Sequence, residues 1–233
     1  MKIAILVDGA FYLKRARLLF GDKTPKDRAL ELMLYCSRHI NEKETGNKLY
    51  RIFYYDCSPS TKSVYHPLLK KDIHLGKSSL FAWATEFHSE LITKRKLALR
   101  RGELLESTAG YTLNSKAVRK LCGGYIGIED LRETDFHLDI QQKGVDLRIG
   151  LDIASIAYKQ QAKQIVLIAG DSDFVPAAKH ARREGIDFIL DPMWNPIKPS
   201  LHEHIDGLIS CVSRPPNNIN DPLYAKREGT YER

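Results

Sequence analysis

Four short apolar runs in this chain each end in an aspartate, and no other feature constrains the fold as much. They are KIAILVD at 2–8, RIFYYD at 51–56, QIVLIAGD at 164–171 and IDFILD at 186–191. Continuous apolar runs of this length, rich in Ile and Val, are typical of strands buried on both faces of a parallel sheet. Stretches with helical spacing lie at 25–40, 145–160 and 174–184. Strands that alternate with helices predict an α/β fold around a mostly parallel sheet.

The stretch from residue 60 to residue 136 interrupts this alternation. It is longer than an ordinary crossover connection and therefore predicts an insertion, with a helix of its own near 80–94. We expect one domain over residues 1–212 that carries this insertion. A flexible tail is expected at 213–233, because that segment is rich in Pro, Asn and charged residues.

The composition is that of an ordinary globular protein, with 43% hydrophobic and 28% charged residues. The four cysteines lie far apart without CxxC spacing, which predicts reduced thiols and argues against zinc or disulfide sites. The N-terminal apolar run is too short for a signal peptide, and no run is long enough to cross a membrane. We therefore expect a cytoplasmic protein with no membrane partner.

The net charge of +7 permits nucleic-acid binding, and its distribution is uneven. Eight basic and two acidic residues lie between residues 94 and 120. Arg95, Arg100 and Arg101 are the candidate contacts to RNA phosphates in this cluster. A solvated helix face followed by a loop has the same composition, so both interpretations stay open.

The aspartates that end the four apolar runs indicate a metal site. The carboxyl ends of parallel strands meet at one edge of a sheet, where such folds place their ligands. Carboxylates that gather there repel one another and take up protons unless a cation neutralises them. Mg²⁺ and Mn²⁺ prefer oxygen ligands and work alongside substrate phosphates. A strand-end aspartate can instead form a turn, and we assign that role to Asp191 and partly to Asp56.

A second acidic contribution comes from QQKGVDLRIGLD, residues 141–152. Asp146 falls in the first turn of an amphipathic helix, where its charge also suits the helix dipole. Asp152 is flanked by apolar residues and needs a partner, which Arg148 can supply as an i, i+4 pair. Lys143 precedes the helix, where a cation can meet a phosphate or balance the acidic charge.

Three motifs together resemble the NYN domain, a group within the PIN-like nuclease fold, and within it the LabA-like branch. They are VDGAF at 7–11, KGVD at 143–146 with Asp152 behind it, and GDSDF at 170–174. The resemblance covers about 1–57 and 137–192 and leaves the insertion unexplained. It implies a three-layer α/β sandwich with a central, mostly parallel sheet. It also implies an acidic pocket that holds Mg²⁺ or Mn²⁺ for the hydrolysis of RNA phosphodiesters.

Carried over position by position, the resemblance implies Asp8, Asp146, Asp171 and Asp173 as metal ligands, with Asp152 a further catalytic candidate. Lys143 joins the catalytic candidates because of its charge and position. One departure concerns Phe11, which stands where many members have an asparagine three residues after the first aspartate. This change removes one polar contact to substrate or water and leaves the metal ligands in place.

The function we expect is that of a metal-dependent ribonuclease, and two others stay open. A non-catalytic RNA-binding or regulatory module would keep the acidic fold and use the basic insertion. A phosphatase of the haloacid dehalogenase type also carries GDSD after a strand. Its nucleophile motif needs a second aspartate two residues after the first, where this chain has Ala10. RNA cleavage under Mn²⁺, compared with metal-free binding, separates the enzyme from the binding module.

Overall fold

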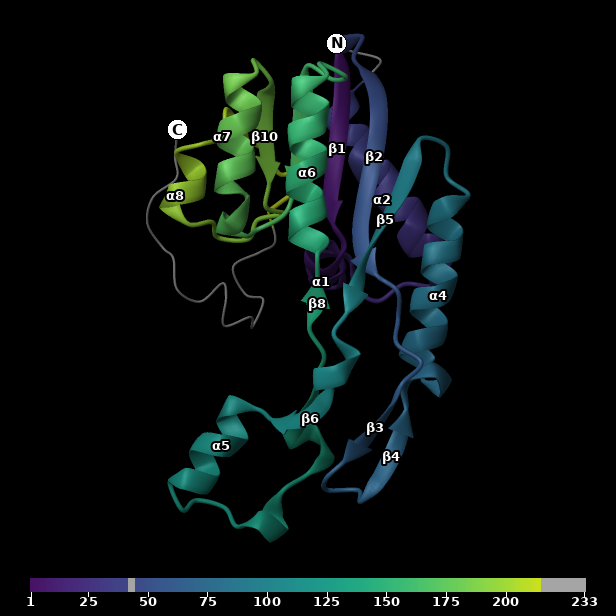
Figure 1. The fold of residues 1–233 in the computed structure, drawn as a ribbon, viewed down its shortest axis with the longest axis vertical. Helices are drawn as coiled ribbons and strands as arrows, with labels where there is room; N and C mark the ends of the chain where they lie inside the picture. The colour runs from purple at the N-terminus through teal and green to yellow at the C-terminus, as the bar shows by residue number, and fades with distance from the viewer. Residues whose placement is uncertain (42–44, 215–233) are drawn as a thin grey trace.

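The computed structural model describes residues 1–41 and 45–214, and its centre is a seven-stranded sheet in the order β11-β10-β9-β1-β2-β5-β8. The strands are β1 (Lys2–Asp8), β2 (Lys48–Cys57), β5 (Leu97–Leu104), β8 (Gln142–Lys143), β9 (Gln164–Ile168), β10 (Asp187–Asp191) and β11 (Gly207–Leu208). Neighbouring strands are parallel except β5 and β8, which are antiparallel. The prediction of an α/β fold around a mostly parallel sheet is confirmed (Figure 1). The tail expected at 213–233 lies outside the described residues except for its first two.

Helices cover both faces of the sheet and complete a three-layer sandwich (Figure 1). One face carries α1 (Gly9–Phe20), α2 (Pro25–Ile40) and α4 (Ser79–Ile92), and the other carries α6 (Val145–Tyr158) and α7 (Val175–Arg183); the short α8 (Pro199–His202) follows β10. In β1, Ile3, Ile5 and Val7 join the core on the α1 side, and Ala4 and Leu6 join the core on the α6 side. Successive side chains of a strand point to opposite faces of the sheet, so a strand that is covered on both faces is apolar at every position. Within the described residues, no helix combines the length and apolar character needed to span a bilayer.

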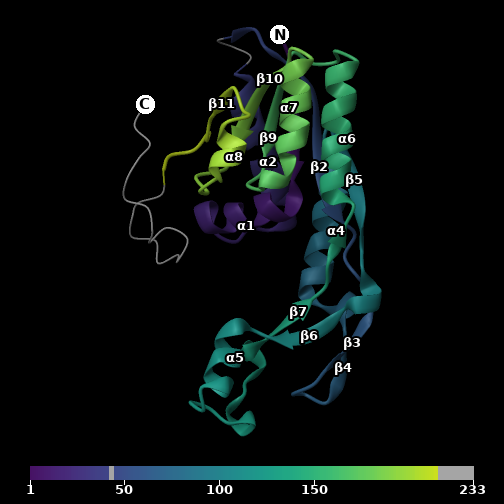
Figure 2. The ribbon, with the colours of Figure 1, turned by 60° about the vertical axis from the view of Figure 1, so that its left-hand side comes forward.

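The part of the chain that departs from the sandwich is smaller than the insertion expected at 60–136. Helix α4 packs against α2, and β5 pairs in parallel with β2, so both belong to the main layers. The unit β2-α4-β5 is an ordinary crossover between parallel strands. What protrudes is a lobe made of residues 58–78 and 105–141, which extends beyond the edge at which the parallel strands end (Figures 1 and 2).

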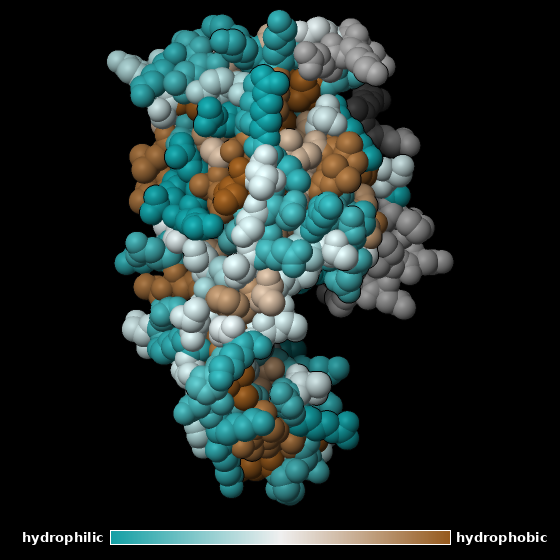
Figure 3. All heavy atoms as spheres, turned by 90° about the vertical axis from the view of Figure 1, so that its right-hand side faces the viewer, coloured by the Kyte–Doolittle hydropathy of each residue, from teal (hydrophilic) through white to brown (hydrophobic). Residues whose placement is uncertain are grey.

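The lobe has two small sheets, which contact each other through aromatic rings. It contains β3 (Ser63–His66), β4 (Lys71–His74), β6 (Gly110–Leu113), α5 (Ser115–Cys122) and β7 (Phe136–Asp139), paired as β3-β4 and β6-β7. The buried ring of His66 lies 4.4 Å from the ring of Tyr111 and 5.1 Å from that of Phe136. Tyr125 and Ile128 are 83% and 77% exposed, and hydrophobic atoms reach the surface at this end of the molecule (Figure 3).

The basic residues between 94 and 120 do not form one patch. Arg95 precedes β5, whereas Arg100 and Arg101 lie in the middle of the strand, about 17 Å further along and level with the carboxyl end of β2. Three others, Lys116, Arg119 and Lys120, lie on α5 in the lobe (Figure 2). The candidate RNA contacts are therefore split between the start of β5 and its middle.

The two faces of α6 give a test of the fold. Ile153 is fully buried against the sheet, and Leu151 on the same helix is 60% exposed. We expect Ile153→Ala to lower the free energy of unfolding by about 2–5 kcal/mol, because it leaves a cavity in the core. Leu151→Ala, the matched control, should change it by less than about 0.5 kcal/mol. Urea unfolding of both variants measures the difference, and equal losses would contradict the assignment of the buried face.

Candidate active site

Five aspartates gather where β1, β2 and β9 end, and we call this set the acidic edge. It consists of Asp8, Asp56, Asp146, Asp171 and Asp173. In the strand register, Asp8 lies opposite Tyr55 of β2, and its neighbour Val7 lies opposite Ile168 of β9. The chain then reaches Asp171 three residues after Ile168. Parallel pairing of adjacent strands thus brings VDGAF and GDSDF to the same edge.

Asp8 is the most perturbed carboxyl group of the acidic edge. It ends β1 and caps α1, because its Oδ1 accepts a hydrogen bond from the backbone N–H of Phe11 at 3.2 Å. Burial raises the pKa of Asp8, and the negative charges of Asp146 and Asp56 raise it further, while the Phe11 amide lowers it. The resulting pKa is about 6. The carboxylate of Asp8 is therefore held by a backbone hydrogen bond and lies near other negatively charged side chains.

Asp146 enters the acidic edge from the first turn of α6. Gly144 precedes this helix with φ of 78°, a left-handed conformation that glycine adopts without steric cost, and it turns the chain from β8 into α6. Asp146 is exposed as a residue, yet neighbouring atoms partly desolvate its carboxyl group, and this raises its pKa. The charges of Asp171 and Asp173 raise it further. The KGVD and GDSDF motifs are thus electrostatically coupled.

Asp171 caps a single helical turn, η5 (Ser172–Phe174), that follows β9, and Asp173 lies within this turn. Oδ1 of Asp171 accepts a hydrogen bond from the backbone N–H of Asp173 at 3.1 Å. Gly170 allows a close approach here, because a Cβ at this position would lie 2.6 Å from the ring of Phe11. The residue that replaces the family's asparagine therefore packs against the GDSDF loop. It supplies an apolar contact where an amide would offer hydrogen bonds.

Asp56 has a buried partner that the sequence did not reveal. Its Oδ2 lies 3.1 Å from Nε2 of His88, whose side chain is 4% exposed. Its Oδ1 accepts hydrogen bonds from the backbone N–H of Cys57 at 2.7 Å and from Nε2 of Gln142 at 3.4 Å. Both Asp56 and Cys57 lie within β2, so the Cys57 bond does not form the turn that was partly expected of Asp56. The contact between His88 and Asp56 could not be predicted, because the helix that carries His88 was expected to belong to the insertion.

Asp152 lies away from the acidic edge and has a different partner from the one expected. It stands six residues after Asp146, about 9 Å along α6. The hydroxyl group of Tyr55 donates to its Oδ2 at 2.8 Å, and Nε of Arg100 donates to the same atom at 3.1 Å. The expected pair with Arg148 is wrong, because Arg100 of β5 supplies the positive charge instead. Asp152 thus ties α6 to β2 and β5.

Two exposed cations lie near the acidic edge. Lys143 occupies β8, opposite Glu103 of β5, and directly precedes Gly144. Arg101 lies opposite Asp56 in the register of β5 with β2. Arg100, by contrast, is held by Asp152 and lies 5.3 Å from the ring of Phe53. The two exposed cations are therefore better placed than Arg100 to meet an anionic ligand.

The donor set of the acidic edge fits a hard divalent cation. Every donor is a carboxylate, and burial together with mutual repulsion raises the pKa of Asp8 and Asp146. No three of these carboxylates have ligand atoms within 4.8 Å of one another. Among the described residues, the one group of His, Cys, Asp and Glu side chains that meets this distance lies elsewhere and consists of His39, Asp191 and Cys211. Mg²⁺ keeps several waters when it binds to protein, so a wider spacing of carboxylates still suits it.

A model of the NYN domain family matches residues 84–201, just over half of the chain. The match begins in α4 and ends in α8, so it includes Asp146, Asp171 and Asp173, whereas Asp8 precedes it. It also runs through β5 and much of the lobe, which the motif resemblance had left unexplained. No curated protein matches this sequence.

The raised pKa of Asp8 predicts how stability depends on pH. The pKa is about 6 in the folded chain and 3.8 for the free group, so ionised Asp8 disfavours folding. Stability from this group is present below about pH 4 and is lost as the pH rises to about 6. Asn at this position keeps a capping oxygen without the charge. In metal-free buffer at pH 7, the free energy of unfolding of Asp8→Asn should therefore be about 1–3 kcal/mol higher than that of the parent.

The comparison uses chemical denaturation between pH 4 and pH 8 with a chelator present. The gain should shrink as the pH falls toward 4 and vanish below it, where Asp8 becomes protonated in both states. Asp187→Asn is the matched control, because Asp187 lies at the opposite end of the sheet and accepts a hydrogen bond from Gln164 at 2.6 Å. A difference between Asp8→Asn and the parent that does not depend on pH would contradict the electrostatic explanation.

Proposed function

Because this chain belongs to the NYN domain family, whose PIN-like fold is that of nucleases, we propose that it is a metal-dependent ribonuclease. The reaction is hydrolysis of RNA phosphodiester bonds. The observation that supports it most is the electrostatic coupling of the acidic edge. In addition to burial, the charge of Asp146 raises the pKa of Asp8, and the charges of Asp171 and Asp173 raise the pKa of Asp146. Carboxylates held in this way are stabilised by a bound cation.

Mg²⁺ or Mn²⁺ would be held by Asp8, Asp146, Asp171 and Asp173. When bound, the cation lowers the pKa of a coordinated water and offsets the charge that develops on the phosphate. Backbone contacts fix the ligands in advance, since Asp8 caps α1 and Asp171 accepts the N–H of Asp173. Ligands that are already in place lose little conformational freedom when the ion binds.

The exposed cations beside the acidic edge give the RNA its first contacts. Lys143 and Arg101 can pair with phosphates that flank the reacting one. Of the three arginines suggested by the sequence, the proposal retains Arg101 near the site. Arg100 is engaged by Asp152, and Arg95 precedes the amino end of β5. Asp152 acts through the packing of α6 and the position of Arg100.

The mechanism predicts a large loss of cleavage from a nearly isosteric change. Asp171→Asn keeps the shape and the hydrogen bond to Asp173 but removes one negative charge. With Mn²⁺ and a labelled single-stranded RNA, it should cut about 100-fold more slowly than the parent or not at all, because cation binding weakens. The products are resolved on a denaturing gel, and circular dichroism checks that the fold is intact.

Asp187→Asn should cut at the rate of the parent, since that residue is remote from the acidic edge. If the parent binds RNA but does not cut it with Mn²⁺, the non-catalytic binding module replaces the enzyme. If Asp171→Asn cuts as fast as the parent, the acidic edge is not the catalytic site.

The split of the basic cluster predicts different effects for two arginines. In the Asp171→Asn background, which should keep the RNA intact, Arg101→Ala should weaken RNA binding and reduce the salt slope by about one. Arg95→Ala should leave both quantities unchanged, because Arg95 precedes β5 and lies about 20 Å along the chain from Arg101, away from the acidic edge. Fluorescence anisotropy at several salt concentrations measures the slopes, and equal effects of the two substitutions would remove Arg101 from the proposed RNA contact.

A further inference from the structure

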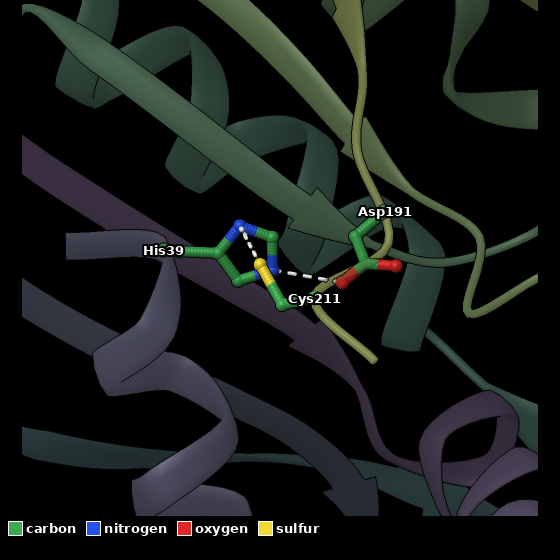
Figure 4. Close-up of side chains that lie close together, drawn as sticks. All are labelled: His39, Asp191 and Cys211. Carbon is green, nitrogen blue, oxygen red and sulfur yellow. Dashed lines mark hydrogen bonds and ion pairs between the residues drawn. The ribbon is translucent and has the colours of Figure 1, made fainter. Parts of the chain in front are cut away.

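A second cluster of reactive side chains lies outside the acidic edge. It joins His39 in the last turn of α2, Asp191 at the end of β10 and Cys211 just beyond β11 (Figure 4). Nε2 of His39 lies 2.7 Å from Oδ2 of Asp191, and Nδ1 of His39 lies 3.4 Å from Sγ of Cys211. The imidazole therefore connects a carboxylate and a thiol through its two different nitrogens.

Asp191 is fully buried and well supplied with hydrogen-bond donors. Besides His39, the hydroxyl of Tyr35 donates to Oδ2 at 2.5 Å. The backbone N–H of Met193 donates to Oδ1 at 2.7 Å and the hydroxyl of Ser210 donates to the same atom at 3.1 Å. These donors compensate the buried negative charge and hold the carboxylate in one orientation. Asp191 in turn fixes the orientation of the His39 ring.

The surroundings of His39 favour its charged form. Its side chain is 2% exposed, and burial alone lowers its pKa. The hydrogen bonds and charges of Asp191 and Cys211 outweigh burial and raise the pKa to about 9. Both ring nitrogens then donate, so Sγ of Cys211 accepts a hydrogen bond from a cationic ring. Cys211 is partly exposed, so small reagents have access to that residue.

The same three residues have ligand atoms within 4.8 Å of one another, which also suits a metal ion. Two features favour an activated thiol instead. The ring presents different nitrogens to the sulfur and to the carboxylate, and one ion uses a single nitrogen of an imidazole. Both oxygens of Asp191 already accept hydrogen bonds, which a metal would have to displace.

We propose that Cys211 is a reactive thiol, activated by His39 and oriented through Asp191, that forms mixed disulfides with low-molecular-weight disulfides. The thiolate of Cys211 attacks one sulfur of R–S–S–R, and a new sulfur–sulfur bond joins the protein to one half. The other half leaves as R–S⁻ with the electrons of the broken bond and takes a proton from solvent. Cys211 is oxidised and the leaving half is reduced, so no other oxidant takes part. This site is independent of the proposed nuclease activity.

The other cysteines serve as internal controls. Burial raises the pKa of Cys36 well above its ordinary range and that of Cys57 to about 11, so both should react slowly. Cys122 on α5 is exposed, and its thiol makes no hydrogen bond among the described contacts. It represents an accessible thiol without an imidazole partner.

Labelling of the reduced, full-length, metal-free protein tests the proposal. Iodoacetamide and oxidised glutathione are each applied between about pH 6 and pH 8, and peptide mapping by mass spectrometry follows every cysteine. At about pH 6, Cys211 should react at least about tenfold faster than Cys122. A rate at Cys211 no higher than that at Cys122 overturns the proposal.

His39→Gln removes the charge of the ring while an amide can still donate to Asp191. It should slow labelling of Cys211 at about pH 6 by about tenfold and leave Cys122 unchanged, with circular dichroism confirming the fold. Unchanged labelling of Cys211 in this folded variant contradicts the proposal. The zinc content of the untreated parent is also measured. One zinc ion per chain in the parent, and none in Cys211→Ser, would make the cluster a metal site instead. If His39→Gln does not fold, the comparison of Cys211 with Cys122 in the parent still decides.

Discussion

Repulsion between carboxylates at the end of the central sheet is the constraint on which the rest of the site depends. The fold leaves these groups little freedom to separate. Asp8 is fixed as a helix cap at the end of a buried strand, and Asp146 is fixed in the first turn of α6. Burial and the neighbouring negative charges raise the pKa of both groups, so their charge is compensated either by protons at lower pH or by a cation. The chemistry proposed for the chain uses the second of these outcomes.

Much of the sandwich could be predicted from sequence, because its central strands are covered on both faces. Such strands are apolar at every position, and the four apolar runs correspond to β1, β2, β9 and β10. The strand β5, LALRRGEL, was missed because it contains two arginines and a glycine. Arg100 is tolerated there, because Asp152 neutralises it and its guanidinium lies over the ring of Phe53. Helix α1 was missed because it begins directly after β1, without a separating turn.

Partners that are distant in the sequence explain the other differences. Local spacing offered Arg148 as the partner of Asp152, whereas the fold brings Arg100 there across β5 and α6. Spacing likewise offered no partner for Asp56, which His88 contacts from α4. Cys211 lies 172 residues from His39, and no CxxC spacing marks it, so its contact with His39 could not be predicted from the sequence. Side-chain chemistry that depends on such pairs emerges only once the register of the sheet is known.

Crystals soaked with Mn²⁺ and measured at a wavelength where manganese scatters anomalously test the central claim most directly. The account predicts an anomalous peak between Asp8, Asp146 and Asp171, with carboxylate oxygens at the short distances typical of a hard cation. It also predicts that the peak disappears in Asp171→Asn crystals soaked in the same way. Soaks that leave the acidic edge without a peak, or that place manganese beside His39 and Cys211 instead, would contradict it.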